Sequence, residues 1–197
     1  MKKRLLTFLF LMTAVFCFGQ EESGHLLFKG IPIDGTLKEF VTKLEAKGYE
    51  LIDVREGSSL LKGNFAGFKD CIIVVNTITG KDLVYSASVL FEKYDTWRPL
   101  ETDYLKLKTY LTIKYGAPEQ VEEKFPEYEK YNIIPDDIQK MSELLKNTCS
   151  YSSVFRKEKG TIFLTISSNN KTTGSVGLVY RDQLNYSIEN IEALEDL

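Results

Sequence analysis

The chain has 197 residues, of which 43% are hydrophobic and 27% are charged, and its formal net charge at pH 7 is −3. This composition is that of a folded globular protein rather than a disordered chain, and the length fits one domain or two closely packed halves. The acidic balance argues against a nucleic-acid-binding protein, which usually carries a clustered basic surface.

The N-terminal segment has the layout of a secretory signal peptide. Lys2, Lys3 and Arg4 precede the apolar run 5–18, which is too short to cross a bilayer. We therefore expect residues 1–19 to be removed and the protein to be exported, periplasmic or secreted, with no membrane-spanning segment in the mature chain. An alternative makes Cys17 the lipid-bearing cysteine of a lipoprotein, but Phe16 stands where that signal usually has a small residue.

Residues 20–95 are predicted to form a first unit of one helix followed by strands. Thr36 and Glu39 have capping-box spacing, an apolar stripe runs from Leu37 to Leu44, and Gly48 stands where a helix commonly ends, so we expect a helix over 37–47. Segments 49–55, 61–68, 70–77 and 83–91 are rich in β-branched and aromatic residues and predict strands. In the last strand one set of alternate residues is apolar or aromatic and the other set contains two serines, which predicts one buried face and one face nearer water. The first set is Leu83, Tyr85, Ala87, Val89 and Phe91, and the second is Val84, Ser86, Ser88 and Leu90.

Residues 96–197 are predicted to form a second unit with the same order. Apolar residues recur at helical spacing from Leu100 to Leu111, and Gly116 ends this helix. Segments 150–157, 160–167 and 174–181 predict antiparallel strands joined by hairpin turns. A helical insertion at about 119–147 interrupts the second unit, with a short helix that begins near Pro135.

The predicted fold class is α+β. We expect two tandem helix-plus-antiparallel-strand units that form one curved antiparallel sheet with helices packed on one face. This order and size resemble the β-lactamase-inhibitor-protein-like fold, and the chain is similar to small exported proteins of unknown function from gut bacteria. The resemblance implies an inhibitor or an envelope-assembly module, although a fold by itself does not define a function.

Two cysteines, Cys71 and Cys149, remain after the predicted cleavage. An even number in an exported protein favours a disulfide. The alternative is two separate buried thiols, since a bridge requires the two residues to lie close and face each other.

Motifs for common enzyme chemistry are missing from the sequence. His25 is the only histidine and lies near the predicted mature N-terminus, so we interpret it as an incidental surface residue. Histidine-dependent nucleophilic catalysis therefore lacks its usual base, and no phosphate-binding or zinc-protease motif occurs. We expect no catalytic residue, metal or cofactor. The alternative is a hydrolase that uses paired carboxylates on a glycan or other envelope substrate.

Three aromatic residues are candidates for partner binding. Tyr128 and Tyr131 lie in the acid-rich insertion, where they could contact a protein or sugar or instead form a lid over the core. Trp97 either anchors the second helix on the sheet or is a half-exposed binding hot spot. The outer faces of the predicted strands also carry small polar residues that could receive a partner, namely Ser86, Ser88, Thr161 and Thr165.

The sequence thus predicts an exported, non-catalytic binding or protein-interaction module of the bacterial envelope. Its partner is expected to be another envelope protein or a glycan, and not a nucleic acid. The contact surface is predicted to be one sheet face or the inserted loop.

Overall fold

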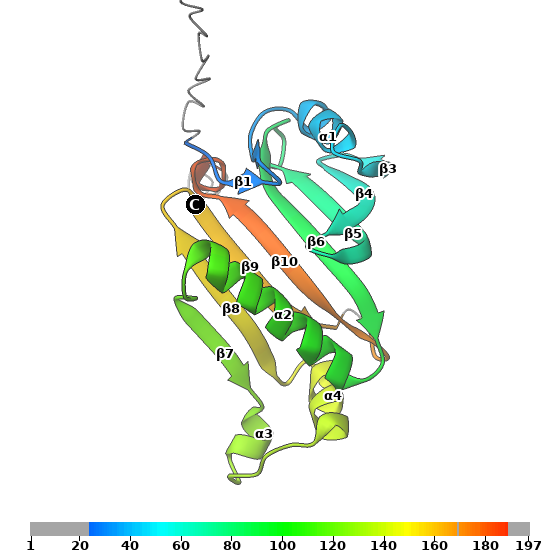
Figure 1. The fold of residues 1–197 in the computed structure, drawn as a ribbon, viewed down its shortest axis with the longest axis vertical. Coiled ribbons are helices and arrows are strands. Elements are labelled where there is room, and N and C mark those ends of the chain that lie inside the picture. The colour runs from blue at the N-terminus through cyan, green and yellow to red at the C-terminus, as the bar shows by residue number, and fades with distance from the viewer. Residues whose placement is uncertain (1–23, 169, 189–197) are drawn as a thin grey trace, which may run out of the picture.

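The computed structural model describes residues 24–168 and 170–188, so the predicted signal peptide lies outside the described residues. The fold is α+β and is built around one large antiparallel sheet (Figure 1). In the described ranges, no helix combines the length and apolar character needed to cross a membrane.

Eight strands form the large sheet in the order β3-β4-β5-β6-β10-β9-β8-β7. A separate two-stranded sheet near the N-terminus pairs β1 with β2. The strand bounds are β1 (Leu27–Phe28), β2 (Ile31–Pro32), β3 (Glu50–Arg55), β4 (Ser58–Phe65), β5 (Phe68–Thr77), β6 (Val84–Tyr94), β7 (Gln120–Lys124), β8 (Ser150–Lys157), β9 (Gly160–Ser167) and β10 (Gly174–Asp182).

The large sheet consists of two units that meet at its centre. Each unit is a helix followed by four antiparallel strands, with α1 (Leu37–Glu45) before β3–β6 and α2 (Trp97–Tyr115) before β7–β10. The last strands of the two units, β6 and β10, pair antiparallel, so the two meanders extend outward from this seam. The insertion between β7 and β8 carries α3 (Pro126–Glu129) and α4 (Asp137–Lys146).

The helices cover one face of the sheet because their apolar stripes need a partner surface. The predicted capping box begins α1, and that helix buries Phe40, Val41 and Leu44. Helix α2 lies along β9 and β10 (Figure 1), and the Tyr104 hydroxyl lies 2.6 Å from that of Ser153 on β8. The buried side chains between helices and sheet form one continuous core.

The bounds of β4 and the presence of β7 differ from the sequence prediction. Strand β4 ends at Phe65 rather than residue 68, because Ala66 and Gly67 form a turn in which both residues have positive φ, at 50° and 84°. Strand β7 lies inside the segment predicted as an insertion. Its sequence, QVEEK, is mostly polar because β7 is an edge strand with no neighbour beyond it in the sheet.

Strand β6 changes the direction of its side chains at a bulge. Asn76 pairs with Ser86 and Thr77 pairs with Val84, so Tyr85 is an extra residue without a partner in β5. Val84 is buried and Tyr85 is not, the reverse of the alternation predicted for this end of the strand. The predicted face holds from Ala87 onward.

The possible disulfide between Cys71 and Cys149 does not form, and both residues are free thiols. Cys71 lies in β5 and Cys149 immediately precedes β8, four strand positions away in the sheet. At about 4.8 Å per strand, this separation is roughly 19 Å, far beyond the reach of a disulfide. The two separate thiols are therefore consistent with the alternative interpretation.

Candidate functional site

Among residues 24–168 and 170–188, no helix packs over the centre of one face of the large sheet. Leu61, Ile73, Val89 and Leu178 are opposite one another in neighbouring strands and are buried beneath the helices. Because side chains alternate between faces, the residues next to these four point to the other side, which we call the open face. Its central row consists of cross-strand neighbours Leu60, Val74, Ser88, Val179 and Phe163.

The central row is mostly apolar yet only partly buried. Ile72 and Leu90 extend the apolar surface into the adjacent row, where they pair across β5 and β6. In the described part of the chain no element covers this surface, and an exposed apolar surface of this kind is characteristic of interaction sites. The open face therefore differs from the small polar surface that the sequence predicted, although Ser86, Ser88, Thr161 and Thr165 do lie on it.

Arg181 is the distinctive charged residue of the open face. The centre of its guanidinium lies 4.9 Å from the ring centroid of Phe163 and 4.5 Å from that of Tyr186. Among the described residues, no carboxylate lies within 4.0 Å of Arg181, and its buried Nε has no hydrogen-bond partner. The guanidinium is therefore held by two aromatic rings, and no carboxylate of the described residues compensates its charge.

Arg181 belongs to the row of cross-strand neighbours next to the central row. Two other arginines, Arg55 and Arg156, lie at the ends of that row, and both already have carboxylate partners. Arg55 contacts Asp53 at 2.8 Å, and Arg156 contacts Glu119 at 3.0 Å. A buried or half-buried donor without an acceptor is costly unless a ligand satisfies it. This contrast identifies Arg181 as the position on the open face that is most suited to an incoming anionic group.

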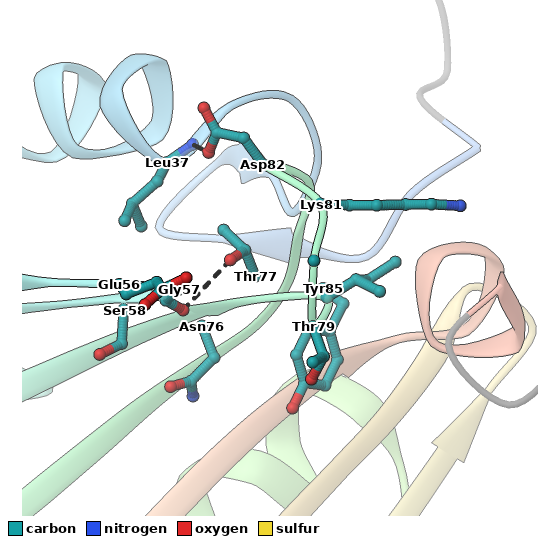
Figure 2. A pocket seen from close by; sticks show the side chains of 12 residues that line it. Leu37, Glu56, Gly57, Ser58, Asn76, Thr77, Thr79, Lys81, Asp82 and Tyr85 are labelled. Atoms are coloured by element: carbon teal, nitrogen blue, oxygen red, sulfur yellow. Dashed lines mark hydrogen bonds between the residues drawn. The ribbon is translucent and has the colours of Figure 1, made fainter. Parts of the chain in front are cut away.

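A cavity of about 700 Å³ continues the open face beyond Arg181. Ser58, Asn76 and Tyr85 from the open face form part of its lining, as Figure 2 shows. The Tyr85 ring stacks on Tyr186 with 6.2 Å between centroids, so the cavity and the Arg181 stack form one continuous surface. Most of the other lining residues are polar and come from the turns between β3 and β4 and between β5 and β6.

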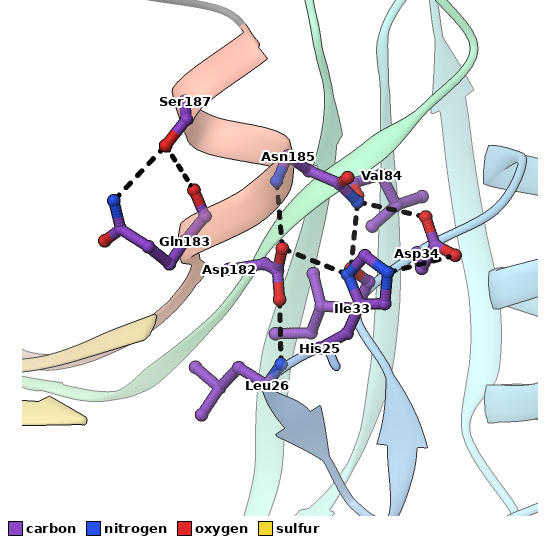
Figure 3. A network of polar contacts seen from close by, with 9 residues as sticks. All are labelled: His25, Leu26, Ile33, Asp34, Val84, Asp182, Gln183, Asn185 and Ser187. Carbon is purple, nitrogen blue, oxygen red and sulfur yellow. Dashed lines mark hydrogen bonds and ion pairs between the residues drawn. The ribbon is translucent and has the colours of Figure 1, made fainter. Parts of the chain in front are cut away.

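A buried polar network holds the short helix at residues 183–188, which carries Tyr186 (Figure 3). Asp182 is fully buried and accepts hydrogen bonds from the backbone N–H groups of Leu26 and Asn185, at 2.7 and 3.0 Å. The Asn185 amide donates to the carbonyl oxygens of Ile33 and Val84, at 3.1 and 2.9 Å. The network therefore fixes the position of Tyr186 over Arg181.

His25 belongs to this network, so the prediction of an incidental surface histidine is wrong. Its Nδ1 lies 3.1 Å from Asp182 and its Nε2 lies 3.5 Å from Asp34, and only 21% of its side chain is exposed. The signal was missed because Asp182 is 157 positions away in the chain. With a carboxylate at each ring nitrogen, His25 is placed to join the N-terminal segment to the sheet rather than to act as a general base.

A hydrolase of the predicted alternative kind would need two carboxylates facing one cavity. Glu56 and Asp82 both line the 700 Å³ cavity, but Glu56 is exposed at a hairpin turn and Asp82 accepts a 2.8 Å hydrogen bond from the N–H of Leu37. Elsewhere, the Tyr94 hydroxyl lies within hydrogen-bond distance of both Glu92 and Asp103. Burial raises the pKa of the Asp103 carboxyl. This pair does not line the cavity.

The structure separates the three aromatic residues predicted to bind a partner. Trp97 is 0% exposed and packs edge-on against Phe125 and Tyr151, with ring centroids 5.3 and 5.0 Å away. The prediction of a half-exposed hot spot at Trp97 is therefore wrong, and its alternative role as an anchor of α2 is the one observed. Tyr128 is partly buried against the core, whereas Tyr131 is 63% exposed.

The insertion presents a second apolar surface close to Tyr131. Ile134 and Ile138 are 92% and 82% exposed, and Ile133 is also exposed. The acids Asp136 and Asp137 lie between them in the sequence, and Asp136 caps α4. This segment therefore makes an exposed apolar tip on the insertion.

Within residues 24–168 and 170–188, no group of three or more histidine, cysteine, aspartate or glutamate side chains is arranged to hold a metal ion. No protein-family model, curated protein or solved structure matches the chain. The resemblance to the β-lactamase-inhibitor-protein-like fold therefore stays a prediction.

Proposed function

We propose that the protein is an exported, non-catalytic binding module of the bacterial envelope that receives a protein partner on the open face. The observation that supports this most is Arg181, a guanidinium without a carboxylate partner among the described residues, held by Phe163 and Tyr186 beside an uncovered apolar surface. Arginine and aromatic residues are the side chains most enriched in binding hot spots.

The chemistry of the open face defines the expected partner. Apolar residues such as Val74 and Val179 favour apolar side chains opposite them, and Arg181 favours an aspartate or glutamate carboxylate. We therefore expect the partner to present an acidic residue next to an apolar segment. Such a segment would occupy the central row with its carboxylate at Arg181.

A glycan is the second candidate ligand, and the polar cavity favours it. Ser58 and Asn76 offer hydrogen-bonding groups, and the Tyr85 ring lines the same cavity (Figure 2). A carboxylate-dependent hydrolase is less favoured, because Asp82 already binds the backbone at Leu37. Export is tested separately by mass spectrometry of the mature protein, which we expect to begin at Gln20.

The binding proposal is tested by photo-crosslinking in the bacterium that produces the protein. A photoreactive amino acid replaces Ser88 at the centre of the open face, and the matched control replaces Thr109, which is exposed on α2. We expect a protein adduct from position 88 that is lost in the Arg181→Glu background, and none from position 109. Adducts of equal yield from both positions, or an adduct insensitive to Arg181, would refute the proposal.

A further inference from the structure

Two adjoining cavities lie on the helix-covered side of the sheet, away from the open face. The larger, of about 400 Å³, lies between β1, the C-terminal end of α2 and the turn from β8 to β9, which meet at one end of the molecule (Figure 1). The smaller, of about 190 Å³, is lined mainly by apolar and aromatic side chains, among them Phe65, Leu111 and Leu178. Lys114 and Tyr115 line both cavities.

Lysines surround the opening of this cavity pair. Lys114, Lys157 and Lys159 line the larger cavity, and Lys29 lines the smaller one. Glu158 is the one acidic residue that lines either cavity. The chain as a whole is acidic, so four lysines around one apolar recess are a local reversal of charge.

Among the described residues, three of these lysines have no carboxylate partner. Within the described part of the chain, no carboxylate oxygen lies within 4.0 Å of Lys29, Lys114 or Lys157. Lys29 and Lys114 instead lie over the rings of Phe65 and Tyr115, at 5.7 and 4.9 Å from the ring centroids. Their ammonium groups are therefore placed at the border between apolar lining and solvent, where an anionic head group would meet them.

We propose that this cavity pair is a binding site for an anionic amphiphile, a molecule with a carboxylate or phosphate head and an unbranched apolar chain. The apolar chain enters the recess lined by Phe65, Leu111 and Leu178, and the head group pairs with the lysines at the opening. A recess of this kind, apolar inside with a few convergent charged groups, is the usual form of a small-molecule site. The site shares no residue with the Arg181 stack, so it does not depend on the function proposed above.

The test is calorimetric titration of the whole protein with sodium carboxylates of increasing chain length, with dodecyl phosphate, with inorganic phosphate alone and with a maltoside that has the same dodecyl chain. Burial of one methylene group contributes about 0.8 kcal/mol, which is roughly fourfold in affinity. We expect affinity to rise by about that factor for each added methylene until the recess is full. We also expect weaker binding at high salt, because exposed charges are screened.

Charge-reversal variants assign the binding to the lysines. Lys114→Glu combined with Lys157→Glu should weaken dodecyl phosphate binding at least tenfold, whereas Lys47→Glu, on the exposed surface after α1, should leave it unchanged. The proposal would be overturned if the maltoside or inorganic phosphate bound as tightly as dodecyl phosphate. It would also be overturned if the double variant and Lys47→Glu bound dodecyl phosphate with equal affinity. If none of the anionic amphiphiles bound at concentrations up to the millimolar range, the proposal would be overturned as well.

Discussion

The guanidinium of Arg181 lies over the ring of Phe163, 4.9 Å from its centroid, on the face of the sheet opposite to the one that the helices cover. The two residues belong to neighbouring strands, where Arg181 pairs with Thr161 and is therefore diagonal to Phe163. This arrangement places a charged group on an apolar surface without making it part of the core. Its consequences for stability and for binding can be measured separately.

Replacement of Arg181 should have little effect on stability. Arg181→Ala removes cation–π contacts at a partly exposed site, so we expect the free energy of unfolding to fall by about 1 kcal/mol or less. Trp97→Ala removes a fully buried side chain and should lower it by about 3–5 kcal/mol. Urea denaturation of both variants measures the difference. A similar loss in both would mean that Arg181 is a structural residue.

Replacement of Asn185 should destabilise the attachment of the N-terminal segment. Asn185→Ala leaves the buried carbonyl oxygens of Ile33 and Val84 without their donor, and we expect a loss of about 2–4 kcal/mol. Hydrogen exchange should accelerate first at the amide of Ile33, which pairs with Leu26. Gln183→Ala, two positions away and exposed, is the control and should change stability by less than about 0.5 kcal/mol.

Cys71 and Cys149 should behave as unreactive thiols while the protein is folded. Burial raises the pKa of the Cys149 thiol to about 11 and also raises the pKa of Cys71. Because the thiolate is the reactive form, a thiol reagent at pH 8 should react slowly with folded protein and rapidly after denaturation. Two reactive groups should then appear without any reductant. If they appear only after reduction, the two cysteines form a disulfide.

Glu101 should make stability depend on pH through the link between the insertion and α2. Burial raises the pKa of this carboxyl, but hydrogen bonds from neighbouring donors, including Tyr151 and Lys140 at 3.1 and 3.2 Å, outweigh it and place its pKa below the ordinary value. A lowered pKa in the folded state means that the contribution is complete above pH about 4.3 and is lost as pH falls through the folded value.

The matching variant is Glu101→Gln, which keeps the shape of the side chain but not its charge. We expect it to be less stable than the original protein by about 1–2 kcal/mol at pH 7, with the difference disappearing as the pH falls from 5 to 3. Denaturant titrations across that range measure the difference. A difference that grows on acidification would show that the pKa of Glu101 is raised instead.

Local signals predicted most of the fold. The capping box at Thr36 and the turns on either side of β9 depend only on residues that are close in the sequence. The predicted bounds of α1, β8 and β9 therefore agree with the structure to within about two residues. Strand β7 was missed because an exposed edge strand rich in glutamate has the composition of a loop. The bulge at Tyr85 depends on the partner strand and has no signature in β6 alone.

The candidate site was harder to predict, because its residues come together only through strand pairing. Arg181 was visible in the sequence merely as a charge at the end of an apolar strand. Its contact with Phe163 follows from the register between β9 and β10, and its contact with Tyr186 depends on the buried network around Asp182. Trp97 was chosen for its residue type, which does not distinguish a core anchor from an exposed hot spot.

The most direct test of the central claim uses the partner that crosslinking identifies, purified in its free form. Its affinity is measured for the original protein and for the Arg181→Glu variant. If the open face receives an acidic segment, calorimetry should show at least tenfold weaker binding to Arg181→Glu, a smaller loss with Arg181→Lys, and recovery when the partner's contacting acid is replaced by arginine. Equal affinity for the protein and for Arg181→Glu would contradict the account.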